Sequence, residues 1–119
     1  MNIVIVGGGF GGIKSALELS KNKSHNLTLI SDKPDFQYYP ALFSTATGYD
    51  SKQSWVPLKE IFKKIPNVRI VIDAATTYCP ENKQVVGSSG KRYKFDKAIF
   101  ALGSITTYFG IDGLDTYSY

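Results

Sequence analysis

The chain has 119 residues, 43% of them hydrophobic and 20% charged, with a formal net charge of +4 and a single cysteine. This length suits one globular domain with a real core and is too short for two, and no apolar run approaches the roughly 20 residues that cross a bilayer. The lone Cys79 excludes an internal disulfide and favours a reducing, cytoplasmic compartment. The basic residues are scattered along the chain and form no basic arm, so we expect no nucleic-acid partner.

The first predicted unit consists of a strand, a glycine turn, a helix and a second strand. The strands are expected at Asn2–Val6 and Leu27–Ser31, and the helix runs from Phe10 to about Asn22 with one apolar face. A unit of this order within about 30 residues is a βαβ unit, whose two strands should be parallel.

The turn of this unit carries Gly7, Gly9 and Gly12 in the spacing G-x-G-x-x-G. After a strand and before a helix, this spacing predicts a dinucleotide site whose phosphates lie over the free N–H groups of the helix. Gly7 would permit the tight turn, Gly9 the close approach of a pyrophosphate, and Gly12 the packing of helix on strand. A glycine turn that binds nothing is the alternative.

A dinucleotide site of this type also asks for an acidic residue about 20 residues further on, which binds the adenosine ribose. Asp32 lies 20 residues after Gly12, just past the second strand. The spacing favours this role, and an exposed loop carboxylate beside Lys33 is the alternative.

The segment Asp32–Tyr49 has five aromatic residues, two prolines and no regular period. We therefore expect a long irregular connection, and long ordered connections within compact domains tend to be functional. Its aromatic side chains could form part of the core or wall a flat ring in a cleft, and composition alone leaves both open.

The remaining elements complete an α/β fold in one domain, residues 1–119. We expect a Rossmann-type parallel sheet with helices on one face and an antiparallel β-meander on the other. The elements are a helix at Leu58–Ile65, a strand at Val68–Ile72, the meander strands Ala74–Tyr78, Gln84–Val86 and Tyr93–Phe95, and a strand at Lys97–Leu102. Cys79 and His25 stand apart from other potential ligands in the sequence, so we expect no metal site.

Three segments together resemble the type II NADH:quinone oxidoreductases, which are flavoproteins. They are the opening "IVIVGGGFGG", the segment "FQYYPALFSTATG" (Phe36–Gly48) and the segment "FDKAIFALGSITTYFGIDGL" (Phe95–Leu114). Sulfide:quinone reductases share the first two segments, but the third fits them less well.

The resemblance implies that the parent enzyme oxidises NADH through FAD and reduces a quinone. Family members carry a second Rossmann domain for NADH, a quinone site and C-terminal helices that hold the enzyme on the cytoplasmic face of the membrane. This sequence would then be the first, FAD-binding section and inactive alone. Sulfide:quinone reductase or another FAD- and NAD(P)-dependent reductase remains an alternative, as does a non-catalytic nucleotide-binding module.

The resemblance also implies a set of cofactor-binding positions, and it names no catalytic acid, base or nucleophile, because the flavin supplies the chemistry. Pyrophosphate contacts are implied for Gly7, Gly9, Phe10, Gly11 and Gly12. An adenine contact through the backbone is implied for Ala75, contacts near the isoalloxazine ring for Pro40, Thr47 and Gly48, and closure over the cofactor for Ala101, Gly103 and Ser104.

For the ribose the two lines of reasoning disagree. The family pattern, counted back from Pro40, puts Ser31 where an acidic residue is usual, whereas spacing selects Asp32. Side chains alternate along a strand, so only one of the two should point at the ribose. The unbroken register favours Ser31.

Overall fold

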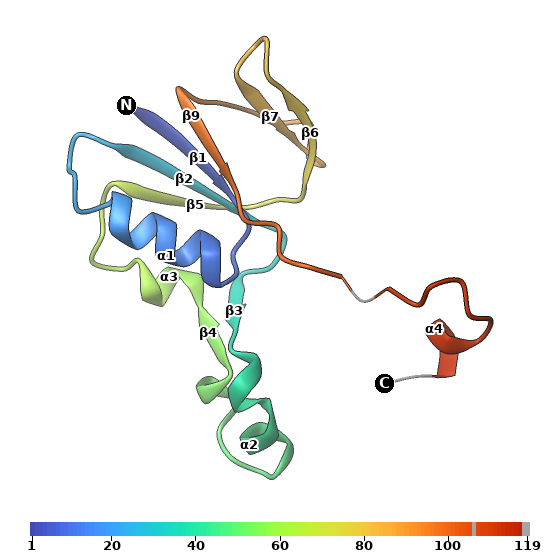
Figure 1. Ribbon diagram of the computed structural model, residues 1–119. Coiled ribbons are helices and arrows are strands. Elements are labelled where there is room, and N and C mark those ends of the chain that lie inside the picture. The colour runs from blue at the N-terminus through green and yellow to red at the C-terminus, as the bar shows by residue number, and fades with distance from the viewer. Residues whose placement is uncertain (106, 118–119) are drawn as a thin grey trace.

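A computed structural model describes residues 1–105 and 107–117. Its centre is a four-stranded parallel sheet in the order β5-β2-β1-β9, as Figure 1 shows. The strands are β1 (Asn2–Val6), β2 (Asn26–Ser31), β5 (Val68–Ile72) and β9 (Lys97–Phe100). Helix α1 (Phe10–Leu19) connects β1 to β2. The chain therefore adds strands on both sides of β1, and this reversal of strand order leaves a crevice at the carboxyl ends of β1 and β9.

The side chains of β1 alternate between two hydrophobic clusters. Ile3 and Ile5 join the cluster under α1, whereas Val4 and Val6 join the cluster on the opposite face. All four are at most 3% exposed. A strand that is apolar on both sides belongs to a sheet covered on both faces, and this confirms the predicted α/β arrangement.

An antiparallel meander covers the second face, as expected. It consists of β6 (Ala75–Cys79), β7 (Gln84–Gly87) and β8 (Arg92–Lys94). Tyr78 packs its ring against Phe95 and Phe100, with centroids 6.1 and 5.0 Å away. These contacts hold the meander against the edge strand β9.

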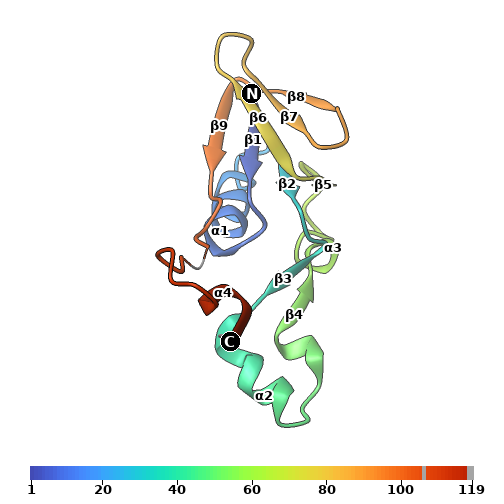
Figure 2. The same ribbon diagram turned by 90° about the vertical axis from the view of Figure 1, so that its right-hand side faces the viewer.

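The segment Asp32–Tyr49 contains short regular elements, so the prediction of a connection without regular structure was wrong. β3 (Asp35–Gln37) pairs with β4 (Trp55–Pro57), and between them lie η1 (Tyr39–Ala41), α2 (Leu42–Ala46) and η2 (Ser51–Gln53). We call residues 35–57 the arm. It extends away from the sheet in both views (Figures 1 and 2).

Several element ends differ from the predictions. α3 (Leu58–Ile61) is half as long as predicted, because the chain tightens into turns after Ile61 while Phe62 still packs in the core. α1 ends at Leu19 and β9 at Phe100, each earlier than expected. A short helix, α4 (Leu114–Tyr117), was not predicted.

Candidate functional site

A cavity of about 620 Å³ lies at the carboxyl end of the sheet. Three stretches of chain form its walls: the glycine turn after β1, the end of β2 with the start of the arm, and the segment after β9. Its lining residues are Gly7, Gly8, Gly9, Phe10, Gly11, Ser31, Asp32, Lys33, Asp35, Phe36, Gln37, Tyr39, Ala101, Leu102, Gly103, Ser104 and Ile105. This is the crevice in which open α/β sheets bind their ligands.

The three spaced glycines occupy different surroundings. A Cβ on Gly7 would lie 2.1 Å from the carbonyl oxygen of Ala101, and the φ of Gly7 is +115°. A Cβ on Gly12 would lie 1.8 Å from the carbonyl oxygen of Gly7. The fold itself therefore requires glycine at both positions. A Cβ on Gly9 would meet nothing within 4 Å, so packing within the protein gives no reason for glycine there.

Helix α1 begins at this turn without a side-chain cap. Gly9 is the N-cap residue, and the first turn contains no acidic residue. The first N–H groups of a helix have no partner within the helix, and the helix dipole favours negative charge beside them. Phe10 and Gly11 of this turn line the cavity, so an anionic group can bind there.

Ser31 and Asp32 both line the cavity, but their side chains differ in freedom. The Ser31 hydroxyl donates to the carbonyl oxygen of Lys33 at 2.8 Å and accepts from the Lys33 N–H at 3.3 Å. Ser31 is 3% exposed, whereas Asp32 is exposed. The hydroxyl of Ser31 therefore closes the turn that carries Asp32.

Aromatic rings form one wall of the cavity. Phe10 meets Phe36 edge-on, with ring centroids 4.8 Å apart, and lies 5.9 Å from Tyr38. Phe36 and Tyr39 line the cavity, whereas Phe43 and Tyr49 are 71% and 65% exposed. Part of the aromatic segment thus walls the cavity and packs the arm on α1. The rest lies at the surface of the arm.

The structure brings together most of the predicted site residues. Nine of them line the cavity: Gly7, Gly9, Phe10, Gly11, Ser31, Asp32, Ala101, Gly103 and Ser104. Gly12 supports the turn from behind.

Besides Gly12, four predicted residues lie outside the cavity lining. Pro40, Thr47 and Gly48 are in the arm, and Ala75 begins β6. The structure of the arm explains the residue type at two of these positions without a cofactor. Gly48 has a φ of +96°, which favours glycine, and Thr47 Oγ1 donates to the carbonyl oxygens of Phe43 and Ser44, both at 3.0 Å.

Other lining residues were not predicted as site residues. They are Gly8, Lys33, Asp35, Phe36, Gln37, Tyr39, Leu102 and Ile105. The fold requires glycine at position 8, because a Cβ there would lie 2.3 Å from Ser31 Oγ. The run of glycines was visible in the sequence, but the contact with Ser31 depends on the parallel register of β1 and β2.

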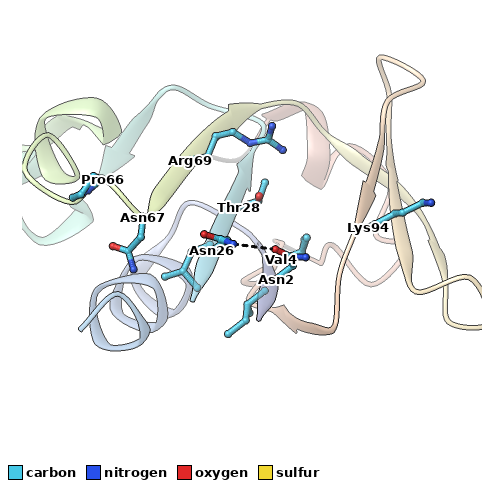
Figure 3. A pocket seen from close by; sticks show the side chains of 10 residues that line it. Asn2, Val4, Asn26, Thr28, Pro66, Asn67, Arg69 and Lys94 are labelled. Carbon is cyan, nitrogen blue, oxygen red and sulfur yellow. Dashed lines mark hydrogen bonds between the residues drawn. The ribbon is translucent and has the colours of Figure 1, made fainter. Parts of the chain in front are cut away.

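A second hollow of about 320 Å³ lies near the amino ends of the strands (Figure 3). Two of its carboxamide nitrogens donate within the protein: Asn26 Nδ2 to Asn2 Oδ1 at 3.4 Å, and Asn67 Nδ2 to three backbone carbonyls. Arg69 and Lys94 also line it, and Lys94 extends away from the strands (Figure 3). Among the described residues, Asn67 Oδ1 is buried without a hydrogen-bond partner. We assign the site to the larger cavity because the glycine turn, the end of β2 and the segment after β9 line it.

Two absences concern the part of the chain that the structure describes. Within it, no three His, Cys, Asp or Glu residues are grouped so that they could hold a metal ion. No helix among the same residues has the length and apolar character that crossing a membrane requires.

Comparison with known proteins places this chain in a family. The sequence model of the pyridine nucleotide-disulphide oxidoreductases matches residues 1–119. A sulfide-quinone reductase of Aquifex aeolicus is 33% identical over 98% of this chain and 27% of its own length. A type II NADH:quinone oxidoreductase of Mycobacterium tuberculosis is 29% identical over 98% of this chain and 25% of its own length.

Solved structures agree with these relatives. The sulfide:quinone oxidoreductase of Aquifex aeolicus superposes with a TM-score of 0.86 at 32% identity, over 97% of this chain and 27% of that one. NDH2 of Plasmodium falciparum, solved with NADH, gives a TM-score of 0.79 at 25% identity, over 99% of this chain and 25% of that one. The chain thus spans about a quarter of the length of these relatives.

Proposed function

Because the chain belongs to the pyridine nucleotide-disulphide oxidoreductase family, we propose that its cavity holds FAD noncovalently. The observation that carries the proposal is the open space at Gly9. The fold has room for a side chain at Gly9, but a pyrophosphate bound over the start of α1 would occupy that room. The ligand therefore explains the glycine.

In this proposal the residues of the cavity bind and orient the cofactor. The free N–H groups at the start of α1 hold the pyrophosphate, and the end of β2 receives the adenosine ribose. Ala101, Gly103 and Ser104 cover the cofactor from the β9 side. We keep Ala75 as the adenine contact and Pro40, Thr47 and Gly48 as neighbours of the isoalloxazine ring. When bound, the flavin supplies hydride and electron transfer.

For the full-length protein we propose oxidation of NADH with transfer of electrons to a quinone. Likeness to the type II NADH:quinone oxidoreductase of Mycobacterium tuberculosis and to NDH2 of Plasmodium falciparum supports this activity. We also propose that the full-length protein is cytoplasmic. As the resemblance implies, it would attach to the membrane surface through a part of its chain other than this section.

Sulfide oxidation is a second candidate. The sulfide-quinone reductase of Aquifex aeolicus is 33% identical, compared with 29% for the Mycobacterium tuberculosis enzyme, and its fold superposes with a TM-score of 0.86. Both relatives match nearly the whole chain, so this section is compatible with either electron donor.

The cofactor is tested by releasing it from the purified full-length protein and identifying it by chromatography. The proposal predicts FAD. NAD in this site without any flavin would contradict it.

The electron donor is tested on the same protein under anaerobic conditions. Rapid mixing with NADH should bleach the visible flavin absorbance, and added quinone should restore it. If sulfide bleaches the flavin and NADH does not, the second candidate is the correct one.

A further inference from the structure

Asp73 is a buried carboxylate that follows β5 and is only 8% exposed. Its oxygens accept hydrogen bonds from the hydroxyls of Ser88 at 2.9 Å, Ser89 at 2.5 Å and Tyr93 at 2.7 Å. The Ser89 N–H adds a fourth bond at 3.2 Å. The bonds from Ser89 and Tyr93 hold the pKa of the Asp73 carboxyl well below its usual range. The carboxylate is therefore charged at neutral pH.

The meander is shaped to receive this carboxylate. A Cβ on Gly87 would lie 1.9 Å from Asp73 Oδ2, so the β7–β8 turn closes tightly on it. Tyr93 is only 7% exposed, and burial together with the bond to Asp73 raises the pKa of its phenol. A buried charge is weak support for stability, since an apolar pair of similar volume often serves as well. Its position suggests a further role.

Asp73 is joined to the wall of the cavity through its backbone. Its N–H donates to the carbonyl oxygen of Ser31 at 2.8 Å, at the end of β2. The Ser31 hydroxyl in turn bonds to Lys33 and closes the turn that carries Asp32. All three residues from 31 to 33 line the cavity.

A second connection leaves the same carboxylate in the other direction. The Ser88 hydroxyl bonds to Asp73, and the Ser88 N–H donates to the carbonyl oxygen of Ala74 at 2.8 Å. Ala74 immediately precedes Ala75, the proposed adenine contact, where the chain passes from β5 into β6 (Figure 1). Asp73 thus contacts both proposed sides of the adenosine: its backbone N–H bonds to the end of β2, and its carboxylate holds Ser88, which bonds to the backbone before β6.

We propose that Asp73 is a positioning residue for the adenosine half of a flavin dinucleotide. It does not line the cavity, and it acts by holding the end of β2 and the start of β6 in place. This inference rests on the proposed FAD site, and it assigns adenosine recognition to a hydrogen-bond network centred in the meander.

The test measures dissociation constants of the full-length apo-protein and its Asp73→Asn variant for FAD, FMN and ADP. FMN lacks the adenosine half, and ADP, measured by competition with FAD, carries only that half. Asp73→Asn should raise the dissociation constants for FAD and ADP about tenfold, while that for FMN stays within about twofold. A merely structural role would affect FAD and FMN alike.

Asp96→Asn is the matched control. Asp96 also accepts a bond from a backbone N–H, that of Asn2 at 2.7 Å, but at the amino end of the sheet. Asp96→Asn should leave all three constants unchanged. Where Asp73→Asn does not fold, Ser89→Ala replaces it, because it removes one hydroxyl donor and keeps the carboxylate. It should shift the constants in the same direction by less.

Two results would overturn the inference: an FAD constant within about twofold of wild type, or equal losses for FAD and FMN. If wild-type protein binds FAD and Asp73→Asn binds it equally well, only the role of Asp73 fails. If wild-type protein binds no FAD, the proposed function and this inference fail together.

Discussion

Gly7, Gly9 and Gly12 share a side chain of one hydrogen but occupy three different environments. Gly7 is required by its positive φ and its contact with Ala101, and Gly12 by its contact with the Gly7 carbonyl. Gly9 alone faces open space. The spacing predicted these three places, because the strand–turn–helix geometry is local. The contact of Gly7 with Ala101 and that of Gly8 with Ser31 could not be predicted, since each joins segments that are distant in the sequence.

Gly12→Ala should destabilise the apo-protein. The added methyl group overlaps the backbone of the turn, and overpacking of this kind costs about 1–3 kcal/mol. Urea unfolding of the apo-protein measures the change. Gly9→Ala is the matched control and should lose less stability, because its Cβ meets nothing within 4 Å and only the preference for glycine at the N-cap is lost. Equal stability of the two variants would show that the turn relaxes around Gly12.

Ser31→Ala should weaken FAD binding by about 0.5–1.5 kcal/mol, the usual contribution of one neutral hydrogen bond. Its hydroxyl donates to Lys33, so a ribose hydroxyl would have to donate to the Ser31 oxygen. Titration of the apo-protein with FAD gives the affinity. Asp32→Ala should lose less FAD affinity than Ser31→Ala. A larger loss for Asp32→Ala would show that the spacing from Gly12, and not the family pattern, identifies the ribose contact.

At the scale of elements, the helices and strands with a strong local sequence pattern were predicted, whereas the pairing of the short strands β3 and β4 was not. The parallel strands and α1 follow from runs and periods in the sequence. β3 and β4 are three residues each and pair only with one another, so neither has a pattern of its own. In α3, the apolar spacing identified the buried face, with Leu58 fully buried, but not the residue at which the helix ends.

The junction between β5 and the meander should be sensitive to acid. The folded pKa of Asp73 lies below the usual 3.8 because of the bonds from Ser89 and Tyr93. Its stabilising contribution is therefore present above about pH 5 and is lost as the pH falls below about 4. Urea unfolding across pH should show Asp73→Asn less stable than wild type at pH 7, with the difference shrinking in acid. A difference independent of pH would contradict this account.

At the scale of the whole molecule, the segment after β9 exposes large apolar side chains. Leu102, Ile105 and Phe109 are 71%, 91% and 86% exposed. Leu102 and Ile105 line the cavity, so a cofactor bound there would cover part of their exposed surface. Phe109 lies outside the cavity lining.

The 119 residues alone should have no NADH:quinone activity. They carry one dinucleotide fingerprint, and the reaction needs a flavin site and a nicotinamide site. NADH consumption with a water-soluble quinone is compared with the rate of free flavin at the same concentration. Turnover by the isolated chain above that rate would contradict the view that these residues supply the flavin site alone.

The central claim is that the cavity at the carboxyl end of the sheet holds the pyrophosphate of FAD. The most direct test is FAD titration of Gly9→Val full-length apo-protein, with its thermal unfolding measured alongside. The apo-variant should stay folded with at most a modest loss of thermal stability, because a Cβ at the N-cap Gly9 meets nothing within 4 Å. It should nevertheless fail to retain FAD, because the side chain fills the space of the pyrophosphate. Retention of FAD with wild-type affinity would contradict the claim.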